Sequence, residues 1–135
     1  MLEKFVKKLS KNASVLLLCH AGADVDSLSC AIALFESLSF STAIGFPDHL
    51  GKNAVELAKN LKIKTVQNPL LSKFDAVILL DFNSVGHAGT LGSELNNFKK
   101  PILILDHHQK ESDSPKTPFV LIDPSALAAS LVVFE

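Results

Sequence analysis

The sequence contains no arginine, tryptophan or tyrosine. Without arginine, every permanently charged cationic side chain is one of thirteen lysines, which are scattered along the chain, and the formal net charge is −1. Proteins that bind along a nucleic-acid backbone need clustered cationic side chains to neutralise the phosphates. Long duplex DNA is therefore not an expected ligand.

Cysteine is also scarce, and Cys19 and Cys30 do not form a C-x-x-C motif. Residues 1–11 are amphipathic and carry lysines, without the apolar core of a signal peptide. No apolar run approaches the ~20 residues that span a membrane. We therefore expect a soluble, cytoplasmic protein with two reduced thiols and no membrane partner.

At 135 residues the chain is long enough for one hydrophobic core but not for two. Short apolar runs alternate with segments of helical periodicity. This alternation favours an α/β fold: an open, mostly parallel, Rossmann-like sheet with helices on both faces. The expected strands are residues 15–19, 40–46, 64–67, 76–80, 101–105 and 119–122, and the expected helices are 27–39, 53–61, 93–98 and 124–134, with a glycine-rich loop at 83–89.

Four of the apolar runs end in a histidine or an aspartate, at His20, Asp81, Asp106 and Asp123. The carboxyl ends of parallel strands open into one crevice, so these residues should converge although they lie far apart in the sequence. Each carboxylate in such a crevice raises the pKa of the next, and divalent cations are the expected compensation. Adjacent residues bring the crevice to five carboxylates and three imidazoles by adding Asp24, Asp26, His107 and His108.

Asp24 and Asp26 precede the first long helix at a spacing of one residue. This spacing lets them diverge toward two neighbouring ions while the helix N-terminus favours their charge. An alternative interpretation is that they are helix caps. With a shared carboxylate at Asp81, they predict a two-metal centre of the kind that activates water and clamps a transferring phosphoryl group. Oxygen and imidazole ligands without thiolate suit manganese, magnesium or cobalt.

The triplet Asp106-His107-His108 is the most specific feature of the chain. Three consecutive polar residues after a five-residue apolar run have no use in packing a core. A lone histidine, such as His49 or His87, more often has a structural role. The triplet therefore indicates chemistry at the end of its strand.

These residues resemble, in order and spacing, the four motifs of the DHH phosphoesterase family. The motifs are His20-x3-Asp24-x-Asp26, the strand-end Asp81, the triplet at 106–108, and Asp123 seventeen residues after Asp106. The resemblance runs from about Val15 to the end of the chain. The family includes RecJ-type exonucleases, phosphodiesterases that act on small oligonucleotides or cyclic dinucleotides, and manganese-dependent inorganic pyrophosphatases.

The resemblance implies two divalent cations, with manganese expected first and magnesium or cobalt as alternatives. Asp81 would bridge the two ions, Asp106 would orient the site, and His108 would face the substrate phosphate. Asp81, Asp106 and His108 are thus the implied catalytic residues. One metal would be held by His20, Asp24 and Asp81, and the other by Asp26, Asp81, His107 and Asp123.

The activity that the resemblance implies is hydrolysis of small nucleotides or short oligonucleotides by a water activated between two metals. The charge balance suits such small partners better than long polymers. An inorganic pyrophosphatase is one alternative, although pyrophosphate requires several cationic groups and the chain has no arginine. A nucleotide-binding or regulatory module without activity is another, because the segment after Asp123 departs from the pattern of the oligonucleotide phosphodiesterases.

Family members usually carry a second, C-terminal domain with a glycine-rich substrate motif that ends in histidine. Nothing in residues 1–135 resembles that motif, and the last apolar segment stops without a helix-ending glycine. We therefore expect residues 1–135 to be a single DHH-type catalytic domain, a fragment that lacks the C-terminal substrate domain. Such a fragment can hold a complete metal centre and still be inactive by itself.

Overall fold

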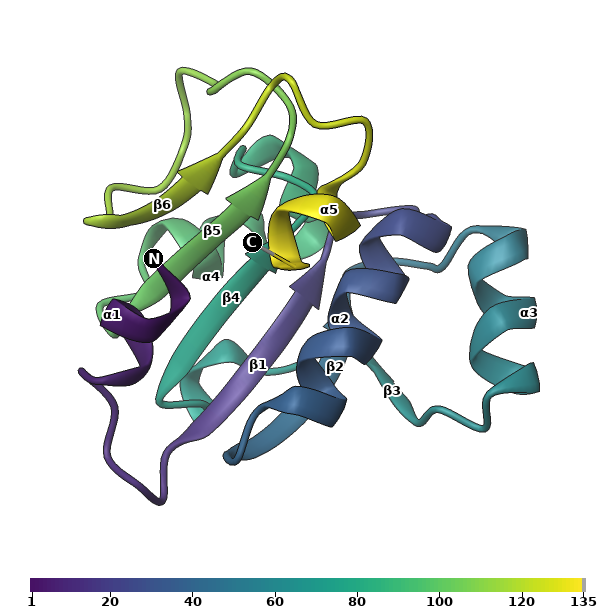
Figure 1. Cartoon of the computed structure of the whole chain (residues 1–135), viewed down its shortest axis with the longest axis horizontal. Coiled ribbons are helices and arrows are strands. Elements are labelled where there is room, and N and C mark those ends of the chain that lie inside the picture. The colour runs from purple at the N-terminus through teal and green to yellow at the C-terminus, as the bar shows by residue number, and fades with distance from the viewer. Residues whose placement is uncertain (135) are drawn as a thin grey trace.

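The fold is built on one six-stranded sheet, as the alternation of elements predicts (Figure 1). The computed structural model describes residues 1–134. Every pair of neighbouring strands runs parallel. The strand order is β3-β2-β1-β4-β5-β6, and the strands are β1 (Ser14–Cys19), β2 (Ser41–Phe46), β3 (Thr65–Gln67), β4 (Ala76–Leu80), β5 (Ile102–Asp106) and β6 (Phe119–Ile122).

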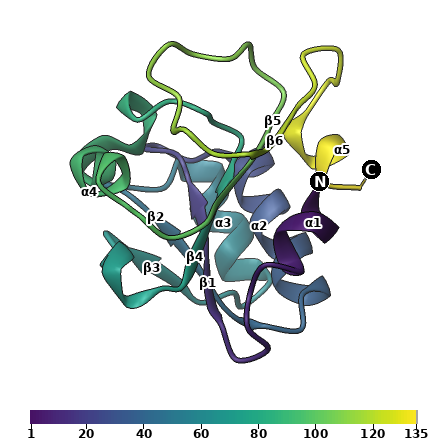
Figure 2. The same cartoon turned by 90° about the vertical axis from the view of Figure 1, so that its left-hand side faces the viewer.

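Helices cover both faces of this sheet (Figure 2). The central strands are apolar at consecutive positions because both of their faces are buried, so that Leu16 packs into one core and Leu17 into the other. Among residues 1–134, no helix is long and apolar enough to cross a membrane. One face carries α1 (Leu2–Val6), α2 (Val25–Ser37), α3 (Lys52–Asn60) and α5 (Ala129–Phe134), and the other carries η1 (Leu71–Lys73), η2 (Gly86–Leu91) and α4 (Gly92–Asn96).

The chain changes direction across the sheet between β1 and β4. From β1 it moves outward through β2 to β3, returns to β4 beside β1, and continues to β5 and β6. In open parallel sheets the crevice for ligands lies beyond the strand ends at such a switch point. Because Cys19 at the end of β1 is in register with Leu80 at the end of β4, His20 and Asp81 emerge side by side at this crevice.

Several element boundaries differ from the expected ones by one or two residues, and two segments differ more. The last helix begins at Ala129 rather than at residue 124, because the Asp123 carboxylate accepts hydrogen bonds from the backbone N–H and hydroxyl of Ser125, at 2.9 and 2.6 Å. These bonds close a turn in place of a helical start. The glycine-rich loop contains a 3₁₀ helix, η2, which is kinked at Gly89, where φ is +53° and glycine meets no steric penalty.

Candidate metal centre

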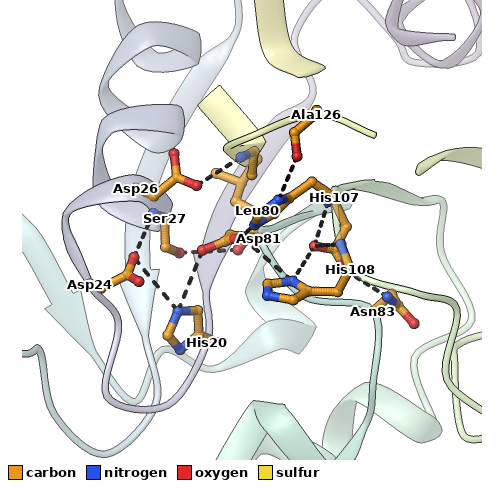
Figure 3. Close-up of polar contacts among 12 residues, drawn as sticks. His20, Asp24, Asp26, Ser27, Leu80, Asp81, Asn83, His107, His108 and Ala126 are labelled. Carbon is orange, nitrogen blue, oxygen red and sulfur yellow. Dashed lines mark hydrogen bonds and ion pairs between the residues drawn. The ribbon is translucent and has the colours of Figure 1, made fainter. Parts of the chain in front are cut away.

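The carboxyl ends of β1, β4 and β5 border a cavity of about 750 Å³. Most of the acidic and imidazole residues that the sequence predicts for the site line this cavity (Figure 3). The convergence of strand ends therefore brings together residues separated by up to 88 positions, from 20 to 108. The predicted residues that line the cavity are His20, Asp24, Asp26, Asp81, Asp106, His107 and His108.

Asp81 is the central carboxylate of the cavity. It has a backbone φ of +65°, a conformation that aspartate and asparagine tolerate better than most residues, and it is only 5% exposed. Burial raises the pKa of Asp81 to about 7, and the charges of Asp26 and Asp24 contribute to the rise. Within residues 1–134, its buried Oδ1 has no hydrogen-bond partner. A buried charge without a partner is costly, so this oxygen calls for a cation.

The two oxygens of Asp81 face two different groups of residues. Each group offers three possible ligand atoms within 4.8 Å of one another. In the first group, His20 Nε2 lies 3.8 Å from Asp81 Oδ2 and 3.9 Å from Asp24 Oδ1. In the second, Asp81 Oδ1 lies 3.4 Å from His107 Nε2 and 3.7 Å from His108 Nδ1. This is the arrangement that a carboxylate shared between two ions requires.

Hydrogen bonds determine which ring nitrogen of His20 and His107 is available. Nδ1 of His20 contacts the carbonyl oxygen of Ala21 at 2.9 Å, and Nδ1 of His107 contacts that of Ala126 at 3.1 Å. A carbonyl oxygen only accepts, so each Nδ1 carries a proton and, in the neutral ring, each Nε2 presents a lone pair toward Asp81. Histidines that bind metals are commonly held in this way.

Asp24 combines the two interpretations that its sequence position allows. It is the N-cap of α2, because its Oδ1 accepts the backbone N–H of Ser27 at 3.0 Å. The Ser27 hydroxyl in turn donates to the carbonyl oxygen of Leu80 at 3.0 Å, which ties the start of α2 to the end of β4. Since a carboxylate has several lone pairs, the capping bond leaves Asp24 able to bind a cation beside His20.

Asp106 is completely buried and holds the histidine pair in place. Its Oδ1 accepts the backbone N–H of His107 at 2.7 Å and Nδ1 of His108 at 2.8 Å, while its Oδ2 accepts the side-chain amide of Asn83 at 2.5 Å. The hydrogen bond from His108 to Asp106 raises the pKa of His108, although burial opposes the rise. The geometry is compatible with the orienting role that the family resemblance implies for Asp106.

Asp26 lines the cavity, but its carboxylate is bound to the first turn of α5. Its oxygens accept the backbone N–H groups of Ala129 at 2.7 Å and of Ser130 at 3.0 Å. Burial alone would raise the pKa of Asp26, but the hydrogen bonds from Ser130 and Ala129 outweigh burial and lower it. Within residues 1–134, neither of the two ligand groups includes Asp26. Its predicted role as a metal ligand therefore gains no support from this geometry.

Asp123 is the one predicted ligand that does not line the cavity, although its backbone N–H donates to the carbonyl oxygen of Asp106 at 3.0 Å. It follows β6 at the edge of the sheet, where its carboxylate binds the backbone N–H and hydroxyl of Ser125. Hydrogen bonding from the Ser125 side chain and backbone lowers the pKa of Asp123. Asp123 belongs to neither ligand group among the described residues, so its predicted role also stays without structural support.

Two residues of the cavity lie in the segment for which the sequence predicted only a loop. Asn83 is buried and His87 is exposed, and both line the cavity. For Asn83 a signal was available, because an amide two residues after the strand-end Asp81 falls in the crevice that parallel strands share. His87 carried no comparable signal.

A model of the DHH family, N-terminal domain, matches residues 14–135. The chain belongs to the DHH family. Among solved structures, an exopolyphosphatase-related protein from Bacteroides fragilis is similar over 98% of this chain, with a TM-score of 0.68 and 18% sequence identity. The chain spans 40% of the length of that protein. No curated protein matches the sequence. The structural likeness establishes that this DHH domain shares the fold of its neighbour.

The residues of the DHH domain fit divalent cations. Their donor atoms are carboxylate oxygens and imidazole nitrogens, which suit manganese or magnesium. Thiolate does not contribute, since burial raises the pKa of Cys19 to about 12 and keeps the thiol protonated. The unpartnered Oδ1 of Asp81 is the independent sign that a cation belongs here.

Asp26→Ala is expected to lower the stability of the DHH domain even without metal. The substitution removes both hydrogen bonds to the first turn of α5, and loss of a helix cap typically costs about 0.5–2 kcal/mol. Urea unfolding in the presence of a chelator measures the effect. Glu36→Ala, at an exposed acid later in α2, is the control and should be near neutral. Equal stability of the two variants, together with loss of metal binding in Asp26→Ala, would identify Asp26 as a ligand after all.

Proposed function

We propose that this chain is a divalent-metal-dependent phosphoesterase domain that hydrolyses small nucleotides or short oligonucleotides. One observation carries the proposal: a buried carboxylate, Asp81, whose Oδ2 faces His20 beside Asp24 and whose Oδ1 faces His107 and His108. A core aspartate with only a structural role would have its oxygens occupied by hydrogen bonds. Membership of the DHH family supports the same reaction class.

The proposed metal ligands are His20, Asp24 and Asp81 for one cation, and Asp81 with His107 for the other. The expectation that Asp26 and Asp123 complete the second set is consistent with their present hydrogen bonds, because each carboxylate keeps further lone pairs. Bound divalent cations would supply the activation of water and the neutralisation of phosphoryl charge. Manganese is the proposed ion, with magnesium or cobalt as alternatives.

His108 has a separate task in this proposal. Its Nδ1 is bound to the buried Asp106, and its side chain lines the cavity and is 58% exposed. A ring held at one nitrogen presents the other to a ligand in a fixed direction. In its imidazolium form, which the raised pKa of His108 favours, the ring carries protons on both nitrogens, and Nε2 would donate a hydrogen bond to a phosphoryl oxygen, where negative charge increases in the transition state.

The proposed substrates are small because the cationic groups of the chain are few and dispersed. The net charge is −1 with no arginine, so a long polyanion would find no cationic track. Pyrophosphate places still more charge on fewer atoms and is the second candidate. We also propose that the protein is cytoplasmic and that a substrate-binding domain follows residue 135.

A substrate panel tests the proposal. The full chain, loaded with Mn²⁺, is incubated separately with bis-nitrophenyl phosphate, a dinucleotide, a longer single strand and pyrophosphate, and each reaction is repeated with a chelator. We expect chelator-sensitive cleavage of the phosphodiester and the dinucleotide. Release of orthophosphate from pyrophosphate without action on the dinucleotide would assign the domain to the pyrophosphatase alternative. Nucleotide binding without turnover of any substrate would indicate a regulatory module.

A further inference from the structure

Asn83 is a buried amide, 1% exposed, in the loop that follows β4. Its Nδ2 donates hydrogen bonds to Asp106 Oδ2 at 2.5 Å and to the carbonyl oxygen of Gln109 at 3.1 Å. Its Oδ1 accepts the backbone N–H of Glu111 at 2.7 Å. Both amide hydrogens and the oxygen are thus engaged, so the side chain has one orientation and imposes it on its partners.

Asp106, which accepts the Asn83 amide, also accepts a hydrogen bond from His108. With Oδ2 bound to Asn83, the Asp106 carboxylate is held so that Oδ1 lies 2.8 Å from Nδ1 of His108 (Figure 3). Asp106 is the acceptor, so Nδ1 carries a proton. The second ring nitrogen is left on the side of the cavity that His108 lines.

We propose that Asn83 is a positioning residue that acts through Asp106 on His108. It fixes the rotation of the Asp106 carboxylate and thereby keeps one proton of His108 on Nδ1, so that Nε2, the nitrogen that gains the second proton in the imidazolium, faces the substrate phosphate. The catalytic consequence rests on the proposed function. The effect on the protonated nitrogen of His108 follows from the hydrogen bonds alone and can be measured without metal or substrate.

The competing explanation is that Asn83 only ties two loops together. A second contact joins the same two loops without touching Asp106: the Ser84 hydroxyl donates to Asp113 Oδ2 at 2.8 Å, and the Gly86 backbone N–H donates to the same oxygen at 2.9 Å. Ser84→Ala therefore loosens the same pair of loops and leaves the Asn83-Asp106-His108 contacts intact. It is the matched control.

The experiment is a two-bond ¹H–¹⁵N correlation spectrum of the full chain, labelled at histidine nitrogens and treated with a chelator. Wild type and Ser84→Ala are expected to show His108 as the Nδ1-protonated tautomer. Asn83→Ala and Asn83→Leu should show a mixture of both tautomers, because the Asp106 carboxylate is then held only at Oδ1, by the backbone N–H groups of His107 and His108, and can rotate about that oxygen. Leucine fills nearly the same volume as asparagine, so it limits any cavity effect, and the His20 signals report whether each variant is folded.

Turnover of bis-nitrophenyl phosphate by the Mn²⁺-loaded variants is the second measurement. We expect kcat to fall by about 10 to 100-fold for both Asn83 variants with KM little changed. Losses of this size are typical when a group that hydrogen-bonds to a residue of a site is removed. An unchanged His108 tautomer in the Asn83 variants would overturn the proposal, and so would unfolding of both, which would make Asn83 a structural residue. If wild type itself turns over nothing, the proposed function fails while the tautomer still decides the role of Asn83.

Discussion

Asp81→Asn is expected to abolish metal-dependent hydrolysis. The loss of activity should exceed the roughly 10 to 100-fold that follows removal of a group hydrogen-bonded to a metal ligand. The two oxygens of Asp81 face both ligand groups, so one substitution affects both. Asparagine suits the positive φ of this position, whereas alanine would add backbone strain. Calorimetric titration of Mn²⁺ into chelator-treated protein, followed by turnover of bis-nitrophenyl phosphate, measures the two effects separately.

Asp75→Asn is the matched control for this substitution. Asp75 precedes the same strand, and its carboxylate accepts the backbone N–H and hydroxyl of Ser14 at 2.9 and 3.0 Å. Its loss removes a charge from the opposite end of β4 and should leave Mn²⁺ binding unchanged. Wild-type Mn²⁺ affinity in Asp81→Asn would show that Asp81 is not a ligand and that the metal centre lies elsewhere.

Asp81→Asn also tests the charge state of the site without metal. Burial, and then the charges of Asp26 and Asp24, raise the pKa of Asp81 to about 7 in the folded protein, whereas an unfolded aspartate titrates near pH ~3.9. Between these values the folded state binds more protons than the unfolded state. The free energy of unfolding contributed by Asp81 should therefore fall as the pH rises through this range, by at most about 1.4 kcal/mol per pH unit.

Urea unfolding of the chelated protein at several pH values from about 5 to about 8 measures this contribution. This range spans the raised pKa of Asp81. The difference in stability between Asp81→Asn and wild type should grow in favour of the variant as the pH rises toward 7, and then level off. A difference that is constant with pH would mean that Asp81 does not hold its proton in the folded, metal-free protein.

The second large effect is expected at His107 and His108, where one substitution should weaken metal binding and the other should lower turnover. His107→Ala removes an imidazole whose Nε2 lies 3.4 Å from Asp81 Oδ1, and it should weaken Mn²⁺ binding by more than about tenfold. His108→Ala should keep Mn²⁺ bound and lower kcat, because His108 Nδ1 is already bound to Asp106 and its ring serves the phosphoryl oxygens. Calorimetry and steady-state kinetics separate the two outcomes.

His49→Ala is the control for the histidine pair. His49 is exposed and does not line the cavity, so its loss should change neither Mn²⁺ affinity nor turnover. Loss of Mn²⁺ from His108→Ala, with normal affinity in His107→Ala, would exchange the two roles. Normal affinity in both variants would mean that the triplet is not a metal motif.

The parallel direction of the strands and the position of the crevice could be predicted because their causes are local. A strand buried on both faces is mostly apolar, as β4 and residues 102–105 of β5 are, and crossovers between parallel strands take one hand. The start of α5 was mispredicted because one of its two causes is not local: besides the turn that Asp123 closes with Ser125, it depends on a distant cap. The first turn of α5 is capped by Asp26, which lies 103 residues earlier in the chain.

The candidate site divides in the same way. Its membership follows from strand ends, so the sequence alone assigned His20, Asp81 and the triplet at 106–108 to one crevice. How a carboxylate near that crevice is oriented depends on its hydrogen bonds. Asp81 Oδ1 has no partner among the described residues, whereas Asp123 is held by Ser125.

By itself, then, the sequence determined which chemical groups meet, because hydrophobic patterning and crossover chirality favour parallel strands, whose carboxyl ends lie at one edge of the sheet. Only the tertiary structure decided how those groups are used. Hydrogen bonds act over about 3 Å and depend on backbone atoms from distant segments, which no spacing in the sequence reveals. This is why Asp26 is a cap for α5 in the structure, and why Asn83, inconspicuous in a loop, contacts the most specific motif of the chain.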